Sequence, residues 1–501
     1  MNVIGLDVGT TACKAIVFSE NGAAEGSAFR EYGIIYGENG KAEQDADAIW
    51  GTTKNVLKEA VKKAGCNDIS AICVSVQGDA VIPVDREINP LHNALLGMDY
   101  RSDMCAAHCA ELFGDRYLFK TTGMRPHPMN SITKILWLKE KAADVFDRTY
   151  KFMTYADYIT AKLGVEPTID YTMASRTMGL DLAEKSWSKN ILSKLDIDES
   201  RLSAVAGSGQ IIGQIDTEVA AELGITSKTL LISGGHDQVC AAIGAGAVRP
   251  GIALNSHGTA EVLSAALDAP LLNETMYNSF YPCYLHAIDN KYFTFSLNHV
   301  GGVLFNWYRD TFAYPEIEKA AASQISAYQV ITSQLSEEPS KLLVLPHFIG
   351  SGTPWCDLES KGAIVGLSLS TTRHDIAKAI LESSAYELRI NIENMNAAGI
   401  VFDELRCVGG AAKSDLWMQV KADITEKKVV LLQTKEAACF GAAILALSAL
   451  NIFNSIEDAV DNLVKPGKTF YPDETRKHQY FEKYMTYKKL YPALKEINRE
   501  L

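Results

Sequence analysis

The chain has 501 residues, of which 47% are hydrophobic and 22% are charged, and its 48 basic and 61 acidic side chains give a formal net charge of −13. The length predicts more than one domain, and the apolar fraction is sufficient for sizeable cores. The negative charge argues against nucleic acid or an anionic membrane as a partner of the whole surface, so any positive potential for a phosphate ligand has to be local.

The N-terminus carries no recognisable targeting signal. It enters an apolar strand at Val3, which leaves no room for the charged and apolar regions of a signal peptide. No apolar run in the chain reaches the length that spans a bilayer. We therefore expect a cytoplasmic protein without a membrane partner.

The ten cysteines are scattered along the chain. Several lie inside apolar segments, which predicts reduced core residues: Cys13, Cys73, Cys240, Cys283, Cys407 and Cys439. Cys105, His108 and Cys109 are close in sequence, but they lack a second ligand pair and lie in a predicted amphipathic helix. A structural role is therefore favoured over a metal site for these three residues.

The first predicted element is a β-hairpin, because apolar residues 3–6 end in a polar segment and residues 15–18 resume as a second apolar run. Backbone N–H groups and hydroxyls at such a tip can bind phosphate oxygens. A carboxylate at the strand end can hold Mg²⁺ through water, and a lysine can add positive charge. The residues concerned are Asp7, Gly9, Thr10, Thr11 and Lys14. An ordinary hairpin turn remains the alternative, because Asp, Gly and Thr are common in turns.

A further predicted strand, residues 74–76, runs into the polar loop Gln77-Gly78-Asp79. Further along, residues 129–140 predict a helix whose packing face consists of Ile132, Ile135, Leu136 and Leu138. Lys134 and Trp137 of this helix are at least as readily structural as catalytic.

The segment 230–247 predicts an apolar strand, two glycines and a helix of small residues, with Asp237 in the first turn of that helix. The positive end of the helix dipole favours an ionised carboxylate there. A general base must be unprotonated at the working pH and within reach of the hydroxyl, and an aspartate fixed at a helix start can meet both demands. The alternative is that Asp237 is an N-cap residue.

The hairpin pattern then recurs over residues 252–263, where two apolar runs flank a tip that contains Gly258 and Thr259. Two hairpins of this kind, about half a chain apart, suggest an internal duplication. Further on, Gly362 and Gly366 bracket a short apolar strand, and residues 376–383 have the spacing of a helix with a buried face.

These motifs, in this order, resemble the FGGY carbohydrate kinases over roughly residues 3–450. The stretch 362–382 resembles the second signature of the family, and residues 129–140 resemble the first, which departs only at Lys141. The resemblance implies transfer of the γ-phosphoryl group of ATP to a sugar or polyol hydroxyl. It implies Asp237 as the base and Asp7 as the residue that positions Mg²⁺.

The resemblance also implies the nucleotide site. The two Gly-Thr tips would bind phosphates, and residues 407–414 resemble the adenine-side loop, in which glycines let the backbone approach a flat purine. Residues 298–307 resemble the start of the helix that lies over the phosphates. The residues expected to bind ATP in the second half of the chain are Gly258, Thr259, Gly302, Gly410, Ala411 and Ser414.

The fold implied by the resemblance is α/β, with two actin-like ATPase (ribonuclease H-like) domains that face one another across a central cleft. We expect the sugar side in an N-terminal domain over residues 1–248, with an insertion at about 100–200. We expect the nucleotide side in a C-terminal domain over residues 249–450, and a helical appendage over residues 451–501.

The substrate site is expected mainly in the first half. Residues 97–101 resemble the substrate loop of the family, with Asp99 and Arg101 in place and Gly97 where glycerol kinases have an aromatic ring. The implied substrate-binding residues are Gln77, Gly78, Asp79, Asp99, Asp237 and Gln238. A surface ion pair is the alternative for Asp99 and Arg101.

Because Gly97 removes an aromatic wall, we expect a substrate larger or more polar than glycerol, and a ketopentose such as xylulose or ribulose fits best. Asp79 and Asp99 would repel a sugar acid unless Arg101 or Arg125 compensates. A kinase for a linear polyol or a sugar acid (glycerol, erythritol, gluconate) and a non-catalytic sugar or nucleotide sensor on the same fold are the alternatives. The expected partner is a small-molecule sugar, and a homodimer is left open.

Overall fold

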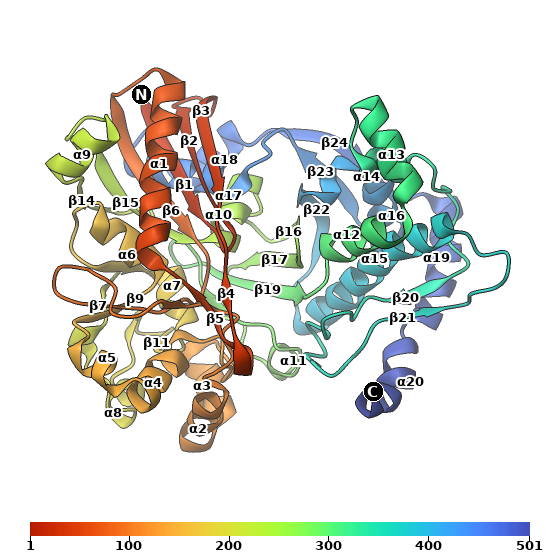
Figure 1. The fold of residues 1–501 in the computed structure, drawn as a ribbon, viewed down its shortest axis with the longest axis horizontal. Coiled ribbons are helices and arrows are strands. Elements are labelled where there is room, and N and C mark those ends of the chain that lie inside the picture. Colours follow the sequence, from red (N-terminus) through yellow and green to blue (C-terminus); the bar gives the residue numbers. More distant parts are fainter.

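The computed structural model describes residues 1–501 and contains two large β-sheets with helices around them (Figure 1). The first sheet has the strand order β14-β15-β6-β1-β2-β3. Its strands are β1 (Asn2–Val8), β2 (Ala12–Ser19), β3 (Ala24–Glu31), β6 (Ile69–Val76), β14 (Ile211–Gln214) and β15 (Leu230–His236). The predicted first hairpin is confirmed, because β1 and β2 pair antiparallel around the tip at residues 9–11.

The second sheet has the order β18-β19-β17-β16-β22-β23-β24. Its strands are β16 (Gly251–His257), β17 (Glu261–Leu267), β18 (Tyr284–Leu285), β19 (Tyr292–Asn298), β22 (Phe402–Gly409), β23 (Lys428–Leu432) and β24 (Pro466–Phe470). The second predicted hairpin is also confirmed. In both sheets the first hairpin strand pairs in parallel with a later strand, β1 with β6 and β16 with β22. The predicted duplication is therefore visible as a repeated strand arrangement.

The first half also carries the helices and short strands that surround its sheet. The helices are α1 (Ala46–Ala64), α2 (Asp103–Phe113), α3 (Asp115–Thr122), α4 (Ser131–Lys141), α5 (Ala143–Arg148), α6 (Tyr155–Lys162), α7 (Tyr171–Arg176), α8 (Lys189–Lys194), α9 (Thr217–Leu223) and α10 (Asp237–Ala245). The short strands are β4 (Ile35–Tyr36), β5 (Ala42–Gln44), β7 (Ile82–Val84), β8 (Ala94–Leu95), β9 (Lys151–Met153), β10 (Thr168–Asp170), β11 (Leu180–Asp181), β12 (Ser186–Trp187) and β13 (Ala204–Ala206). The expected insertion at about 100–200 coincides with α2 to α8.

The second half carries α11 (Glu274–Asn278), α12 (Gly302–Phe312), α13 (Tyr314–Ser323), α14 (Ala327–Thr332), α15 (Arg373–Ala398), α16 (Asp415–Thr425) and α17 (Ala437–Ala449), with the short strands β20 (Leu343–Leu345) and β21 (Ala363–Val365). The predicted strand between Gly362 and Gly366 is β21. The helix predicted after it is α15, which begins at Arg373 behind a capping box formed by Thr372 and Asp375.

The two halves are joined by the helices α10 and α17, which cross at backbone contact. A Cβ atom added to Gly244 would lie 2.0 Å from the carbonyl oxygen of Ala437, and one added to Gly441 would lie 1.8 Å from that of Cys240. Although α17 belongs to the second half of the sequence, it packs against β1 and β6 of the first sheet. One buried cluster of hydrophobic residues therefore spans both halves.

The residues after 450 were expected to form a helical appendage, and this expectation is incomplete. They form the helices α18 (Ile456–Leu463), α19 (Glu474–Tyr487) and α20 (Leu490–Glu500), but also β24, which pairs with β23 as the edge strand of the second sheet. The sequence did not predict this strand, because three of its five residues, Pro466, Gly467 and Lys468, are more typical of turns and exposed loops than of strands.

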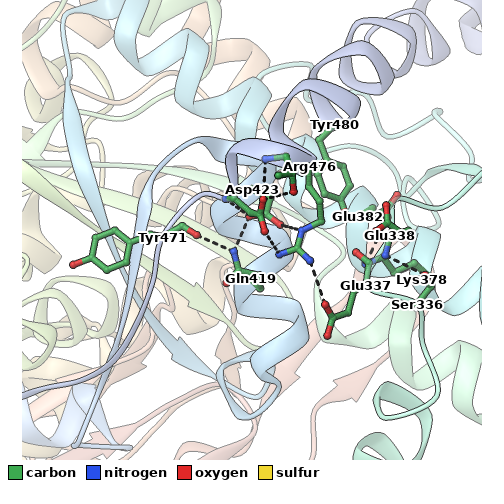
Figure 2. A network of polar contacts seen from close by, with 12 residues as sticks. Ser336, Glu337, Glu338, Lys378, Glu382, Gln419, Asp423, Tyr471, Arg476 and Tyr480 are labelled. Carbon is green, nitrogen blue, oxygen red and sulfur yellow. Dashed lines mark hydrogen bonds and ion pairs between the residues drawn. The ribbon is translucent and has the colours of Figure 1, made fainter.

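A buried polar network holds α19 on α15 and α16 (Figure 2). Arg476 of α19 donates to Asp423 of α16 at 3.0 Å, and the Tyr480 hydroxyl donates to Glu382 of α15 at 3.3 Å. Glu382 lies 3.9 Å from Lys378, and both side chains are buried. The C-terminal helices are thus integrated into the second half by contacts that a composition-based view of the tail does not reveal.

Candidate active site

The first set of predicted site residues meets at one edge of the first sheet. The strands β1, β6 and β15 are parallel, and Val8, Val76 and His236 are aligned across them. The residues that follow these three, namely the hairpin tip, Gln77-Gly78 and Asp237, therefore leave the sheet side by side. Carboxyl ends of neighbouring parallel strands are a common location for ligand sites in α/β proteins.

Asp7 lies one residue before the end of β1 and accepts a hydrogen bond from the Ser75 hydroxyl at 2.8 Å. Burial raises the pKa of Asp7 to about 6, against the opposing effects of the Ser75 hydrogen bond and the Lys14 charge. Lys14 faces Asp7 across the hairpin, and its ammonium group pairs with Glu436 at 2.6 Å. Because Lys14 pairs with Glu436, its charge only partly compensates the buried carboxylate of Asp7.

Asp237 is the first residue of α10, as predicted, and His236 occupies the N-cap position. The alternative that Asp237 serves as an N-cap is therefore not supported. Burial and, to a lesser extent, the nearby charge of Asp7 raise the pKa of Asp237 to about 7, while a hydrogen bond from the Gln238 backbone and the charge of Arg176 oppose the shift. The Nε2 atom of His236 lies 3.2 Å from Oδ1 of Asp237. Burial also lowers the pKa of His236 well below its ordinary value, so the ring is neutral at pH 7.

The second set of predicted residues lines a pocket of about 470 Å³ in the second half. His257 and Gly409 are aligned across the parallel strands β16 and β22, so the Gly258-Thr259 tip and Gly410 leave this sheet together. The pocket contains every nucleotide-side residue predicted from the second half: Gly258, Thr259, Gly302, Gly410, Ala411 and Ser414. Phe305 and Asn306, from the segment 298–307 that resembles the family, also line the pocket, whereas the sequence motifs did not indicate Ser326, Tyr328, Gln329 and Thr332.

Glycine is required at the floor of this pocket for steric reasons. A Cβ atom on Gly302 would lie 2.9 Å from the carbonyl oxygen of Gly258, and one on Gly409 would lie 2.4 Å from that of His257. Gly409 also has a φ of +95°, which L side chains rarely adopt. A Cβ atom on Gly410, by contrast, would meet nothing within 4 Å. Backbone groups are therefore exposed to a ligand along one side of the pocket.

A further pocket of about 380 Å³ is lined by residues of both halves. Thr10, Gln77 and Gly78 come from the edge of the first sheet, and His299 and Thr353 come from the second half. Other members of the lining are Gly97, Met98, Tyr100, Arg125, His127, Phe280, Phe295 and Cys356. The lining has no carboxylate side chain. A Cβ atom on Gly78 would lie 2.9 Å from Nε2 of His236, the atom next to Asp237, so this pocket adjoins the Asp7–Asp237 edge.

Two aspartates predicted to bind substrate are held by arginines. Asp79 accepts bonds from Nε and Nη2 of Arg176 at 3.0 and 2.5 Å, and both side chains are buried. Asp99 accepts bonds from Arg101 and from the backbone N–H of Ala42. Neither aspartate lines the pocket, and the Asp99–Arg101 pair is buried instead of lying on the surface. Their roles as substrate ligands stay predictions.

Of the two predicted glutamines, Gln77 lines the pocket between the halves and Gln238 does not. The Gln77 amide donates to Oε1 of Gln44 at 3.0 Å. The Oε1 atom of Gln238 is buried and has no partner within the protein. Tyr100, from the expected substrate loop, and Arg125, expected to compensate a sugar acid, both line the pocket. His127, His299 and Thr353 were not assigned to the pocket by sequence motifs, because they come from loops and strand ends whose positions only the folded chain defines.

Two family models match almost the whole chain. The N-terminal domain model of the FGGY family of carbohydrate kinases matches residues 2–244, and the C-terminal domain model matches residues 253–450. The chain belongs to the FGGY family of carbohydrate kinases. It is thus an ATP-dependent carbohydrate kinase with the two-domain α/β fold of that family.

Individual relatives carry different substrate names. The chain is 28% identical to the xylulose kinase of Bacillus subtilis over 501 residues, covering 100% of this chain and 98% of that protein. It is 30% identical to the glycerol kinase of Borrelia hermsii over 483 residues, with 94% of each chain covered. A crystal structure of gluconate kinase from Lactobacillus acidophilus superimposes with a TM-score of 0.88 at 26% identity, with 98% of each chain covered. The chain is therefore a sugar kinase whose substrate these likenesses leave unresolved.

The donor set fits ATP and Mg²⁺, the ligands used by the family. Mg²⁺ is usually held by one or two carboxylates together with substrate phosphates, so a dedicated cluster of ligands is not required. No group of three or more His, Cys, Asp or Glu residues close enough to hold a metal is found. Asp7 and Asp237, whose pKa values are raised by burial, are a pair that a cation would stabilise.

No helix has the length and apolar character needed to cross a membrane.

Proposed function

We propose that this kinase transfers the γ-phosphoryl group of ATP to a hydroxyl group of a ketopentose such as xylulose or ribulose. The observation that carries the proposal is the meeting of Asp7, Asp237 and the pocket between the halves at one edge of the first sheet. In this assignment residues 1–248 supply the sugar side and residues 249–450 supply the nucleotide side.

Asp237 acts as the general base. A base works best when its pKa lies near the working pH, and burial and the Asp7 charge bring the pKa of Asp237 to about 7. Its place at the start of α10 fixes the carboxylate relative to the sheet edge. Asp237 accepts the proton of the attacking sugar hydroxyl, and neutral His236 restricts the carboxylate from one side.

ATP occupies the pocket at the Gly258-Thr259 tip, and the first tip at residues 9–11 faces the transferred phosphoryl group. Asp7 would hold Mg²⁺, and the cation would supply positive charge next to the phosphates. The glycines and threonines of the two tips position the phosphate oxygens with their backbone N–H groups and hydroxyls. Residues near the adenine are Gly410, Ala411 and Ser414.

The sugar occupies the pocket between the halves. Gly97 leaves room where an aromatic side chain would narrow the pocket, and Thr10, Gln77, His127 and Thr353 offer hydrogen-bonding groups for several hydroxyls. A ketopentose can satisfy more of these groups than glycerol can. Each buried polar group left unpaired costs about 1–3 kcal/mol, which lowers kcat/KM about tenfold or more.

A sugar acid is the second candidate, and Arg125 is the observation that favours it. Arg125 lines the pocket, stacks on Phe280 and donates to the carbonyl of Tyr277, and it forms no ion pair. The repulsion expected from Asp79 and Asp99 is reduced, because Arg176 and Arg101 neutralise them. A carboxylate at one end of the substrate would provide Arg125 with a partner.

The test of substrate class is a coupled ADP-release assay with a panel of ketopentoses, ketohexoses, polyols and aldonic acids. We expect xylulose or ribulose to have the highest kcat/KM. Arg125→Met should leave kcat/KM for ketopentoses within about threefold if no carboxylate is bound, and it should lower kcat/KM for an aldonic acid by about tenfold or more. Glycerol or gluconate as the best substrate would contradict the ketopentose assignment and leave the kinase assignment intact.

The test of mechanism uses Asp237→Asn and Asp7→Ala. Because the base acts mainly in the transition state, Asp237→Asn should lower kcat by about 10²–10⁴ and change the sugar KM much less. Asp7→Ala and chelation of divalent cations should each stop turnover while circular dichroism shows a folded protein. Near wild-type turnover of Asp237→Asn would exclude Asp237 as the base. Near wild-type turnover of Asp7→Ala, or turnover without a divalent cation, would exclude the role of Asp7 in holding Mg²⁺.

A further inference from the structure

A buried charged cluster lies behind the nucleotide pocket. Lys421 of α16 is completely buried, and its ammonium group lies 2.6 Å from Oε1 of Glu261 and 3.0 Å from Nδ1 of His257. It also donates to Oδ1 of Asn255. Glu261 and His257 are 1% and 2% exposed. No motif in the sequence indicated that these residues meet, because Lys421 is about 160 positions away from the others.

The hydrogen bonds of the cluster determine the state of the His257 ring. An ammonium group has three N–H donors, and three acceptors surround Lys421: Glu261, Asn255 and Nδ1 of His257. Nδ1 also lies 3.0 Å from Oε1 of Glu261, to which it would donate in the other tautomer. Because Lys421 already donates to that oxygen and has a third N–H for Nδ1, we assign Nδ1 as the acceptor and the single proton of the neutral ring to Nε2. Burial and the Lys421 charge lower the pKa of His257, which keeps the ring neutral. At Glu261 burial acts to raise the pKa, but the charges of and hydrogen bonds with Lys421 and His257 together outweigh it and hold the pKa of that carboxyl well below its usual range.

The cluster connects the two walls of the nucleotide pocket. His257 is the last residue of β16 and Glu261 the first of β17, so the pair encloses the tip at Gly258 and Thr259. Lys421 belongs to α16, whose first turn contributes Trp417 to the lining of the same pocket. The rings of His257 and Trp417 meet edge to face at 4.7 Å. One ion pair thus fixes the phosphate-side tip relative to the adenine-side helix.

His257 itself lines the pocket, yet its Nε2 atom is buried and has no hydrogen-bond partner within the protein. Buried donors are rarely left unpaired in native proteins unless a ligand or water completes them. The neighbouring residues Gly258 and Thr259 form the tip that is expected to hold phosphate, so an acceptor oxygen would lie next to this donor.

We propose that Lys421 and Glu261 are positioning residues of the nucleotide site, which hold His257 so that its Nε2–H donates to a phosphate oxygen of the bound nucleotide. The proposal rests on the assignment of this pocket to ATP. It adds a side-chain donor to the backbone donors of the tip. It also assigns a function to a buried ion pair that would otherwise serve stability alone.

The competing explanation is purely structural, and the chain contains a matched control for it. Lys378 and Glu382 form another Lys–Glu pair in the same half, with both side chains buried. This pair belongs to the network that holds α19 (Figure 2), and neither residue lines the nucleotide pocket. Breaking it should lower Tm without changing nucleotide binding.

The experiment measures ADP binding by titration calorimetry and Tm for the full chain and four variants: His257→Leu, His257→Gln, Lys421→Met and Lys378→Met. We expect His257→Leu and Lys421→Met to weaken ADP binding by about tenfold or more, because a hydrogen bond to a charged oxygen is lost. His257→Gln retains an N–H donor and should recover part of the affinity. Lys378→Met should bind ADP as the wild type does. In the turnover assay, the KM for ATP should rise in His257→Leu while the KM for sugar stays unchanged.

The outcomes separate this proposal from the assignment of the pocket. Wild-type protein that binds ADP, together with a His257→Leu variant that binds it equally well, would overturn the role of His257 and leave the kinase site standing. Wild-type protein that binds ADP elsewhere, with Gly410→Val having no effect, would overturn the pocket assignment and this proposal with it. If Lys421→Met does not fold, the two His257 variants decide the matter, because the ion pair remains in both.

Discussion

The ion pair between Asp79 and Arg176, which lies behind Gly78 and Gly97 of the pocket between the halves, offers a direct test of how the proposed sugar site is supported. The two side chains are 4% and 3% exposed and share two hydrogen bonds of 3.0 and 2.5 Å. Asp79 has a φ of +68°, which asparagine adopts more readily than most residues. Asp79→Asn therefore removes the charge with little added backbone strain and leaves Arg176 as a buried cation without a counter-charge.

Loss of one partner from a buried pair costs about 3–5 kcal/mol, so we expect Asp79→Asn to lower the free energy of unfolding by this amount. Arg176→Met alone should cost a similar amount, because it leaves the Asp79 carboxylate unpaired. The double variant should lose less than the sum, with a coupling energy of about 2 kcal/mol or more. Urea denaturation of the four proteins measures the cycle. A loss below about 1 kcal/mol in both single variants, or strict additivity, would refute the view that this pair supports the site.

Three further outcomes follow from the same structure. The kcat/KM of the wild type should fall below a pH of about 7 as Asp237 becomes protonated, and a rate profile flat to pH 5 would contradict its role as the base. The folded state holds protons on Asp7 and Asp237 up to pKa values of about 6 and 7, against an ordinary value of 3.8, so it binds more protons than the unfolded state between these limits. The free energy of unfolding should therefore fall as the pH rises from about 4 to 7 in the absence of Mg²⁺, and denaturation of Asp237→Asn over the same range should show a smaller slope. Gly244→Ala should cost about 1–3 kcal/mol or more, because its Cβ would lie 2.0 Å from the Ala437 carbonyl oxygen, whereas Gly51→Ala in α1, where a Cβ meets nothing within 4 Å, should stabilise the protein by about 0.5–1 kcal/mol.

Local patterns were sufficient to predict the two hairpins, the start of α10 at Asp237 and the glycine-rich end of β22. Each of these features depends on residues within about ten positions of one another. Apolar runs of strand length, glycines at sharp turns and a carboxylate at a helix start are legible in such a window. The residues expected on the nucleotide side came from the resemblance to the family, and the structure gathers those of the second half in one pocket.

Pairing between distant residues could not be predicted in this way. Asp79 looked available to a sugar because its partner Arg176 is 97 positions away. An ion pair of Asp99 with Arg101 was expected only as the alternative to a substrate role and on the surface, and the second partner of Arg101, Glu43, is 58 positions away. The packing of α17 on the first sheet was hidden too, because its glycine contacts are made with α10 and β1. Charge partners and helix crossings are properties of the folded chain.

The two hairpins also show how one scaffold supports opposite electrostatics. Asp7 lies just before the first tip as a buried carboxylate with a raised pKa, and its charge raises the pKa of Asp237 nearby. Beside the second tip the buried carboxylate of Glu261 is neutralised by Lys421, so no free negative charge faces the nucleotide pocket. The first edge is therefore suited to a cation and to a hydroxyl that loses its proton, and the second edge is suited to an anion. Because the proposed phosphoryl transfer requires both environments to meet at one ligand, the backbone crossing of α10 and α17, which joins the two halves, would keep the two edges in place for it.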